Sequence, residues 1–165
     1  MFGGGHERGM RPGTLDVPGI VGMAKALEIA HENREAEQNA IRELREALHA
    51  LLITAGGCSL NGPTVARLAG NLNLSFEHVD GEALLASLEG IAASTGSACT
   101  SADLAPSHVL LAMGKSPAMA RGSIRFSLGR RNTNAEIEWT AERVLEEVRR
   151  LRELSPLHKM ATENS

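Results

Sequence analysis

Hydrophobic positions recur with helical spacing along the first third of the chain. Between Val17 and Ala55, apolar residues repeat every three or four positions, which predicts helix. Pro18 suits a first helical turn, and the Gly56-Gly57 pair suits a helix end. We expect two consecutive helices in this stretch, with a break near His31–Arg34.

A second helical pattern occupies the end of the chain. Thr133 and Glu136 have the spacing of a capping box, in which each residue satisfies the other's backbone N–H. The apolar residues that follow fall on one helical face: Ile137, Ala141, Val144, Leu145, Val148 and Leu151. Ser155-Pro156 ends the pattern, so an amphipathic helix is predicted up to that point.

Short segments with strand-like composition lie between the two helical patterns. Cys58–Leu60 and Asn71–Phe76 are predicted strands, and Asn61-Gly62-Pro63 is a turn signal between them. In Ser123–Leu128, apolar and polar residues alternate. One face of this strand is therefore expected to be buried, with Arg125 on the other face.

The remaining elements are shorter. Ile91–Ser94 could form a further short strand, and Asp80 can cap a helix over Glu82–Glu89. Pro106 is expected to start a short helix that ends near Met113-Gly114. The predicted fold class is α/β, as a small α+β domain with helices packed on a modest sheet.

Composition narrows the classes of function. The chain has 165 residues, of which 42% are apolar and 22% charged, as in one ordinary globular domain. A net charge of −3 and an aromatic content of 2% disfavour a direct nucleic-acid partner. No apolar run approaches the ~20 residues of a membrane span, and the N-terminus lacks the pattern of a signal peptide. Two widely spaced Cys indicate a reducing compartment, which we expect to be the cytoplasm.

Two side chains are candidates for chemistry. Cys99 lies among the small residues of Ser94–Ser101, which suits an accessible reactive thiol, although a lone Cys can also be a small buried hydrophobe. Arg125 could aim its planar guanidinium at a carboxylate, or it could be a solvated strand residue. Cys58 stands beside a glycine pair at a strand start and is expected to be structural.

The first 14 residues carry no apolar stripe and are expected to form a loop. They are rich in Gly and hold a dense set of polar side chains: His6, Glu7, Arg8, Arg11 and Thr14. Backbone N–H groups, Arg side chains and a hydroxyl all suit an anion such as phosphate. The segment could therefore cradle an anion, or it could be a solvated tail.

Two other patterns are discarded. Gly114-Lys115-Ser116 imitates the end of a P-loop, but Val109 stands where the first glycine is required. The six His show no metal-site spacing with each other or with Cys, so no resident metal is expected.

Four stretches together resemble the cysteine desulfurases of the NifS/IscS type, a class V aminotransferase family. They occur in the family's order and at family-like spacing, so the resemblance extends over essentially the whole chain: Gly3-Gly4-Gly5-His6-Glu7-Arg8-Gly9-Met10-Arg11-Pro12-Gly13-Thr14, Ser94-Thr95-Gly96-Ser97-Ala98-Cys99-Thr100-Ser101, Ser123-Ile124-Arg125-Phe126-Ser127-Leu128-Gly129-Arg130 and Arg150-Leu151-Arg152-Glu153-Leu154-Ser155-Pro156-Leu157. The resemblance implies the C-terminal portion of a fold-type I enzyme. Such an enzyme would use pyridoxal 5'-phosphate and act on L-cysteine as a homodimer.

The resemblance also implies roles for individual residues. Cys99 would be the nucleophile that takes the substrate sulfur as a persulfide and leaves alanine, and it could transiently ligate an iron–sulfur cluster. Arg125 would bind the substrate carboxylate, and Thr14 would reach the cofactor phosphate of the other subunit. The sulfur would pass to an iron–sulfur scaffold or another acceptor protein, for cluster assembly or for transfer-RNA thiolation.

One departure from the family concerns the lysine that forms the Schiff base. The sequence contains only Lys25, Lys115 and Lys159, and none stands in the family's Ser-x-His-Lys pattern. We therefore expect residues 1–16 to be an active-site loop segment of the large domain, and residues 17–165 to be the small C-terminal domain. Such a truncated chain would be inactive alone and would need a large-domain complement or a full-length subunit. A stand-alone persulfide carrier and an inert fragment remain alternatives, and a missing complement should leave apolar helix faces exposed.

Overall fold

The computed structural model describes residues 3–95, 106–156, 158 and 160. The chain divides into two compact units, Met1–Glu37 and Gln38–Ser165, and each is described by itself. None of the helices in the described ranges is long and apolar enough to cross a membrane.

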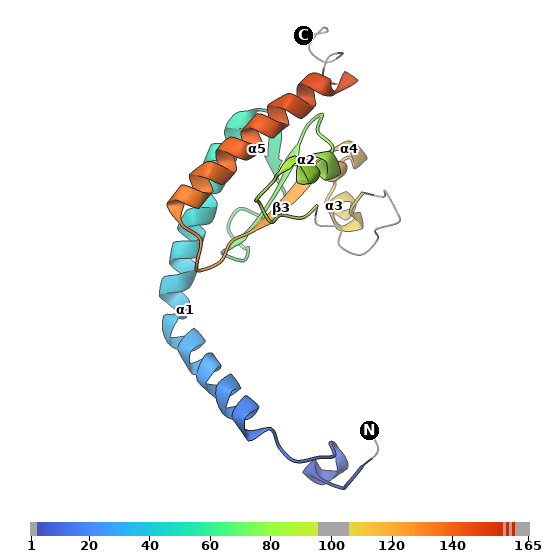
Figure 1. Ribbon diagram of the computed structural model, residues 1–165. Coiled ribbons are helices and arrows are strands. Elements are labelled where there is room, and N and C mark those ends of the chain that lie inside the picture. The colour runs from blue at the N-terminus through green and yellow to red at the C-terminus, as the bar shows by residue number, and fades with distance from the viewer. Residues whose placement is uncertain (1–2, 96–105, 157, 159, 161–165) are drawn as a thin grey trace. The chain divides into compact units, whose positions relative to one another are not determined.

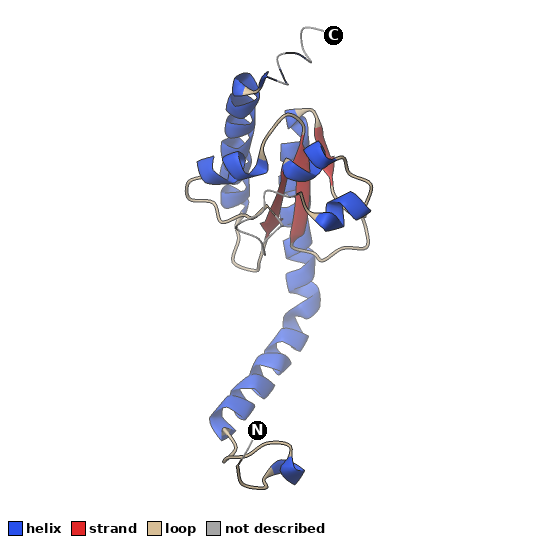
Figure 2. Ribbon diagram, turned by 90° about the vertical axis from the view of Figure 1, so that its right-hand side faces the viewer, coloured by secondary structure: helices blue, strands red, loops and turns tan. Residues whose placement is uncertain are grey.

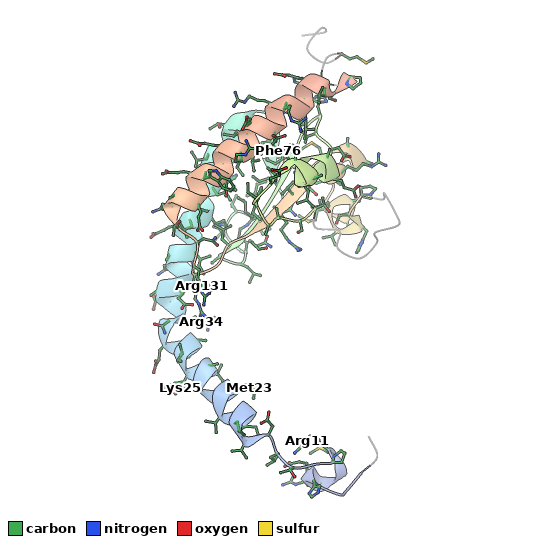
Figure 3. All side chains as sticks on the ribbon, in the orientation of Figure 1. Arg11, Met23, Lys25, Arg34, Phe76 and Arg131 are labelled. Carbon is green, nitrogen blue, oxygen red and sulfur yellow. The ribbon has the colours of Figure 1, made fainter. Side chains whose placement is uncertain are left out.

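The first unit holds a short 3-10 turn and the beginning of a long helix. The 3-10 turn covers Glu7–Gly9, within the segment expected to be a loop. Helix α1 covers Val17–Leu52, and Asp16 caps its start by accepting a hydrogen bond from the Gly19 N–H at 3.1 Å. Apolar side chains on this part of α1 are exposed, as Figure 3 shows for Met23, which is 71% exposed.

Helix α1 corrects the expectation of two helices. The predicted break near His31–Arg34 is wrong, because that stretch contains neither Gly nor Pro to interrupt the helical backbone. The Asn33 side chain donates to the Ile29 carbonyl at 2.9 Å, one turn earlier, instead of competing for a turn conformation. After α1, Ile53–Ala55 forms a 3-10 turn, and the Gly56-Gly57 pair ends the run with positive φ angles, as expected.

The second unit contains an antiparallel three-stranded sheet in the order β1-β2-β3. Strand β1 is Cys58–Leu60, β2 is Asn71–Phe76 and β3 is Ser123–Ser127, so all three predicted strands are confirmed. The further strand expected at Ile91–Ser94 is wrong except for one isolated bridge from Ser94 to Arg125. The Ile91 N–H is already used in a turn, since it donates to the Leu88 carbonyl at 3.2 Å.

Of the described helices that begin in this unit, all except the one at His108–Ala112 are capped by a local side chain. Helix α2 covers Gly81–Ser87 behind its Asp80 cap, and α3 covers His108–Ala112. Helix α5 covers Asn134–Leu154, and its predicted capping box of Thr133 and Glu136 is present. Helix α4, Pro117–Arg121, was not expected from the sequence; it is capped by Ser116, whose hydroxyl accepts from the Met119 N–H at 3.2 Å.

One face of the sheet packs against α5 and the end of α1. Figure 1 shows these two helices on one side of the strands, and Figure 2 shows α1 behind the sheet from the perpendicular direction. The buried cluster between them includes Leu72, Leu74 and Phe76 of β2 with Leu48, Leu52, Val144 and Val148 of the helices. Phe76, which is labelled in Figure 3, is fully buried in this cluster. Burial of this apolar area is the main source of the unit's stability.

The other face of the sheet is polar. Because side chains alternate along a strand, Asn73 and Ser75 of β2 share this face with Ser123 and Arg125 of β3. Helices α3 and α4 lie on this side (Figure 1), with Leu110 and Ala120 buried. Arg125, one of the candidate functional residues, lies on this polar face.

Candidate active site

A pocket of about 410 Å³ opens on the polar face of the sheet. Its described lining consists of polar, apolar and basic residues: Asn61, Gly62, Pro63, Arg67, Asn71, Asn73, Thr95, Ser107, Val109, Leu110, Met113 and Arg125. This lining includes two guanidinium groups and no carboxylate. A water-accessible pocket with this charge balance favours an anionic ligand.

Arg125 lines the pocket, on the face of its strand that the alternation predicts. It is the middle residue of β3, its Cα pairs with that of Asn73 on β2, and it is half-buried. Its neighbours Ile124 and Phe126 are buried on the opposite face, which fixes the direction of the Arg125 side chain. Within the described residues, the Arg125 guanidinium makes no hydrogen bond or ion pair, so all its donors can serve a ligand.

Cys99 lies outside the described residues. The described residues next to this stretch bear on the pocket, however, because Thr95 and Ser107 both line it. Cys99 lies between these two pocket residues in the sequence.

Three pocket residues were missed by the sequence analysis: Asn61, Arg67 and Asn73. The Asn61 N–H donates to the Asn73 carbonyl at 2.9 Å, and its side-chain Nδ2 donates to Asn73 Oδ1 at 2.6 Å. Asn61 is only 5% exposed, and its Nδ2 also donates to Ser75 Oγ at 2.8 Å. The sequence offered one signal for Asn73, which alternates with the apolar residues Leu72 and Leu74 and so should lie on the polar face of its strand. The sequence does not show that Asn73 pairs with Arg125 of β3.

Arg67 holds the turn between β1 and β2. Its Nη2 donates to the Asn61 carbonyl at 2.6 Å, and its Nε donates to the Pro63 carbonyl at 2.7 Å. Burial lowers the pKa of Arg67, and the nearby charge of Arg45 acts in the same direction. The guanidinium is a cation at neutral pH, so it adds positive potential to the pocket.

Cys58 has the properties of a structural thiol. It is a free, half-buried cysteine at the start of β1. Burial raises the pKa of Cys58 to about 11, although the charges of Arg152 and Lys115 oppose this shift. A thiol with such a pKa is almost entirely protonated at neutral pH and is a poor nucleophile.

Thr14 belongs to the first unit. Arg11 Nη1 donates to the carbonyls of Pro12, Gly13 and Thr14 at 3.3, 3.1 and 3.5 Å, which folds the segment around one guanidinium. Thr14 is exposed, and its hydroxyl has no partner among the residues that the structure describes. The hydroxyl is therefore available to an external acceptor such as a phosphate.

Pyridoxal phosphate, the cofactor implied by the sequence resemblance, requires a lysine amine for its aldehyde. Lys25 pairs with Glu28 at 2.9 Å on the exposed surface of α1, and Lys115 donates to Ser59 Oγ at 3.0 Å. Lys159 lies outside the described residues. The described residues therefore offer groups for a phosphate and a carboxylate but no complete site for this cofactor. They also contain no group of three His, Cys, Asp or Glu that could hold a metal ion.

Comparison with known proteins shows to which family this mixed helix-and-sheet fold belongs. The chain belongs to the aminotransferase class-V family, whose model matches residues 5–139. Its curated relatives are named cysteine desulfurase IscS. The chain is 52% identical over 161 residues to the protein of Anaeromyxobacter sp. (strain K), and 51% identical over 160 residues to that of Azotobacter vinelandii (strain DJ / ATCC BAA-1303).

These relatives are longer than the chain. The alignments cover 97% of this chain and 40% of each relative, so the chain spans about two fifths of their length. A solved NifS-like protein matches with a TM-score of 0.73 and 36% identity, over 88% of this chain and 37% of its own. A NifS-like protein from Rickettsia africae ESF-5 matches with a TM-score of 0.73 and 30% identity, over 89% and 39%. The resemblance and the fold class expected from the sequence are confirmed.

Proposed function

We propose that this chain provides the sulfur-accepting thiol and the substrate-carboxylate site of a cysteine desulfurase, which converts L-cysteine to L-alanine and an enzyme-bound persulfide. Arg125 holds the α-carboxylate of L-cysteine through two parallel N–H donors, a geometry that Lys cannot reproduce. The Cys99 thiolate attacks the substrate sulfur. A sulfur–sulfur bond forms as the carbon–sulfur bond of the substrate breaks, and the carbon takes up a proton to leave alanine.

The observation that carries this proposal is the lining of the Arg125 pocket. The Arg125 guanidinium, which has no partner among the described residues, faces a space lined by Thr95 and Ser107. Thr95 is the last described residue before the stretch that contains Cys99, and Ser107 is the second described residue after it. A carboxylate held by Arg125 would thus be bound beside Thr95 and Ser107, which flank Cys99 in the sequence. A stand-alone persulfide carrier, the alternative function, has no need of a carboxylate site.

The cofactor and partners follow from the same proposal. Pyridoxal phosphate, which acts as an electron sink when bound, would be held mainly by a large-domain complement. Residues 1–16 would belong to that complement's active site, with the Thr14 hydroxyl donating to the cofactor phosphate of the other subunit of a homodimer. Cys99 would pass its sulfur to an iron–sulfur scaffold or to another acceptor protein in the cytoplasm.

The experiment combines the purified chain with a polypeptide that carries the upstream part of the Azotobacter vinelandii relative. Pyridoxal phosphate, L-cysteine and a thiol reductant are added, and alanine and sulfide are measured. We expect turnover by the mixture and none by either polypeptide alone. Association of the two polypeptides is checked separately by gel filtration.

Two variants locate the reactive thiol. Cys99→Ala should abolish both turnover and the persulfide trapped by alkylation, whereas the matched change Cys58→Ala should leave both in place. Turnover by the chain alone with the cofactor would contradict the need for a complement. Persulfide that persists in Cys99→Ala would contradict the assignment of the nucleophile. Transfer of labelled sulfur from a full-length desulfurase to Cys99, without alanine production by the mixture, would support the carrier instead.

A further inference from the structure

Asn73 and Arg125 present their side chains to the same pocket. Their Cα atoms are directly opposed on the antiparallel strands β2 and β3, and both residues line the pocket. Directly opposed residues of an antiparallel pair lie on one face, with Cβ atoms about 5 Å apart. A group bound by one of these side chains is therefore within reach of the other.

The Asn73 amide is held in one orientation. Its Oδ1 accepts from Asn61 Nδ2 at 2.6 Å, and Asn61 is itself 5% exposed and bonded to Ser75. An oxygen that accepts this hydrogen bond directs the amide N–H₂ of Asn73 away from Asn61. Among the described residues, no acceptor is bonded to this Nδ2, so Asn73 offers a fixed donor with no protein partner.

The hydrogen-bond donors of the pocket differ in whether they already have a partner in the protein. Arg67 uses its Nη2 and Nε on the carbonyls of Asn61 and Pro63. The Arg125 guanidinium and the Asn73 Nδ2, in contrast, donate to no acceptor within the described part of the chain. A carboxylate has about four lone-pair directions, so it can accept two N–H bonds from Arg125 and another from an amide.

We propose that Asn73 is a second carboxylate-binding residue beside Arg125, and that Asn61 is the residue that positions it. The inference rests on the proposed function, because it concerns the same substrate-carboxylate pocket. A neutral donor fixed beside the guanidinium makes the pocket selective for a carboxylate over an uncharged amide, since the amide presents N–H₂ in place of one acceptor oxygen.

The test is a titration of the isotopically labelled chain followed by nuclear magnetic resonance. The probes are L-alanine, which has the same α-carboxylate as the substrate, and L-alaninamide, which has none. L-Alanine should shift the Asn73 Nδ2 and Arg125 Nε signals, and L-alaninamide should shift neither. Asn73→Asp should raise the dissociation constant for L-alanine at least about tenfold, because a donor to a charged group is replaced by an acceptor.

Three variants distinguish a loss of L-alanine binding from a loss of folding stability. Asp at position 73 can still accept from Asn61 Nδ2, so the thermal unfolding midpoint should change little. Asn71→Asp is the matched control: it adds the same charge to the same pocket lining two residues along β2, opposite Ser127, and should weaken binding less. Asn61→Ala should also weaken binding, because Asn73 loses its support.

Specific outcomes would overturn the inference. A shift at Arg125 without one at Asn73, or equal losses in Asn73→Asp and Asn71→Asp, would remove Asn73 from the site. The absence of any L-alanine shift would exclude both residues as carboxylate ligands in this chain. The persulfide assay on Cys99 is independent of these measurements, so failure here is distinguishable from failure of the proposed function.

Discussion

Ser94 and Arg125 exchange a pair of backbone hydrogen bonds. The Arg125 N–H donates to the Ser94 carbonyl at 2.6 Å, and the Ser94 N–H donates to the Arg125 carbonyl at 3.1 Å. Ser94 precedes Thr95, the last described residue before the stretch that contains Cys99. The bridge therefore joins Arg125, the proposed carboxylate-binding residue, to the described residue that stands next to Thr95 in the sequence.

Removal of this bridge should impair sulfur transfer. Ser94→Pro eliminates the N–H that donates to Arg125, whereas the control Ser94→Ala keeps the backbone intact. We expect Ser94→Pro to lower the free energy of unfolding by about 1 kcal/mol in urea denaturation and to slow persulfide formation on Cys99 in the reconstituted mixture. Ser94→Ala should behave as the unchanged chain does. Equal persulfide rates in the two variants would show that the bridge does not position the segment.

Arg125→Lys tests the carboxylate site directly. Lysine keeps the positive charge but offers no planar pair of donors. In the reconstituted mixture the KM for L-cysteine should rise about tenfold or more, with the unfolding midpoint unchanged because the Arg125 side chain has no partner among the described residues. Arg131→Lys, on an exposed residue of the following loop, is the control. An unchanged KM in Arg125→Lys would remove Arg125 from the substrate site.

The sequence predicts those parts of the fold that local patterns determine. The three strands follow from alternation and turn residues, and α5 follows from its capping box and apolar stripe. A break in α1 was wrongly predicted near His31–Arg34, because the apolar stripe weakens there as it does at the end of a helix. No Gly or Pro interrupts the backbone at this point, and the helix continues. Helix α4 was missed because Pro117–Arg121 is too short to show a period.

Less of the candidate site than of the fold can be predicted from the sequence. Arg125 was found because it interrupts an apolar alternation, and Asn73 interrupts another in the same way. Their proximity depends on which strands pair and in which register, which is a tertiary property. Asn61 and Arg67 lie in the connection from β1 to β2, where the turn residues predict a reversal but not the hydrogen bonds from Asn61 to Asn73 and from Arg67 to Asn61.

Arg152 joins three separate parts of the second unit. Its guanidinium donates to the carbonyls of Ala55 at 2.6 Å, Gly56 at 2.8 Å and Glu77 at 3.0 Å. Arg152→Ala should lower the free energy of unfolding by about 2 kcal/mol, because charge-assisted bonds to several carbonyls are lost together. Arg149→Ala removes only a bond to the Leu145 carbonyl of the same helix, at 3.3 Å, and should cost less than about 0.5 kcal/mol. Urea denaturation of both variants compares them, and equal losses would contradict the role of Arg152.

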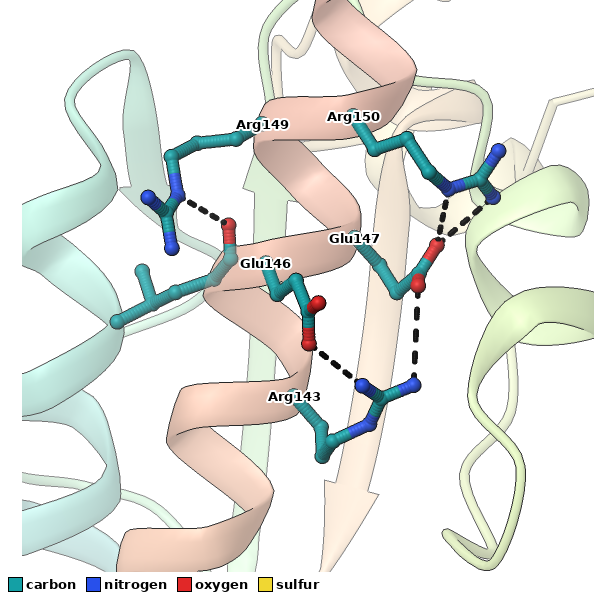
Figure 4. Close-up of polar contacts among 6 residues, drawn as sticks. Arg143, Glu146, Glu147, Arg149 and Arg150 are labelled. Carbon is teal, nitrogen blue, oxygen red and sulfur yellow. Dashed lines mark hydrogen bonds and ion pairs between the residues drawn. The ribbon is translucent and has the colours of Figure 1, made fainter.

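Glu147 gives the stability of the second unit a predictable pH dependence. Figure 4 shows its carboxylate between Arg150, at 2.7 Å, and Arg143, at 3.7 Å. The hydrogen bond from Arg150 holds the pKa of Glu147 below its usual value, despite the opposing effect of burial. A carboxyl group whose pKa is depressed by folding adds stability above its unfolded pKa of about 4.3, and this stability is lost as the pH falls through the folded pKa.

The variant Glu147→Gln should therefore unfold at a lower temperature than the unchanged chain at neutral pH. The difference in the thermal unfolding midpoint should shrink when the pH falls below about 4, since the native carboxyl is then protonated too. Glu146→Gln is the matched control, because Arg143 is the one partner of Glu146 among the described residues, and the Glu146 side chain is 59% exposed. Its effect should be smaller at every pH. A difference for Glu147→Gln that grows with acidity would contradict the depressed pKa.

The two thiols should differ in their rate of alkylation. Since burial raises the pKa of Cys58 to about 11, roughly one thiol in a thousand is ionised at a pH of about 8, and its reaction with iodoacetamide should be slow. Cys99, as the proposed nucleophile, should react first. Peptide mass spectrometry over time identifies the labelled residue, and unfolding in urea should then bring Cys58 to the ordinary rate of an exposed thiol. Cys58→Ser should leave the fast label in place and Cys99→Ser should remove it, whereas fast labelling of Cys58 in the folded chain would show that its thiol is not protected by burial.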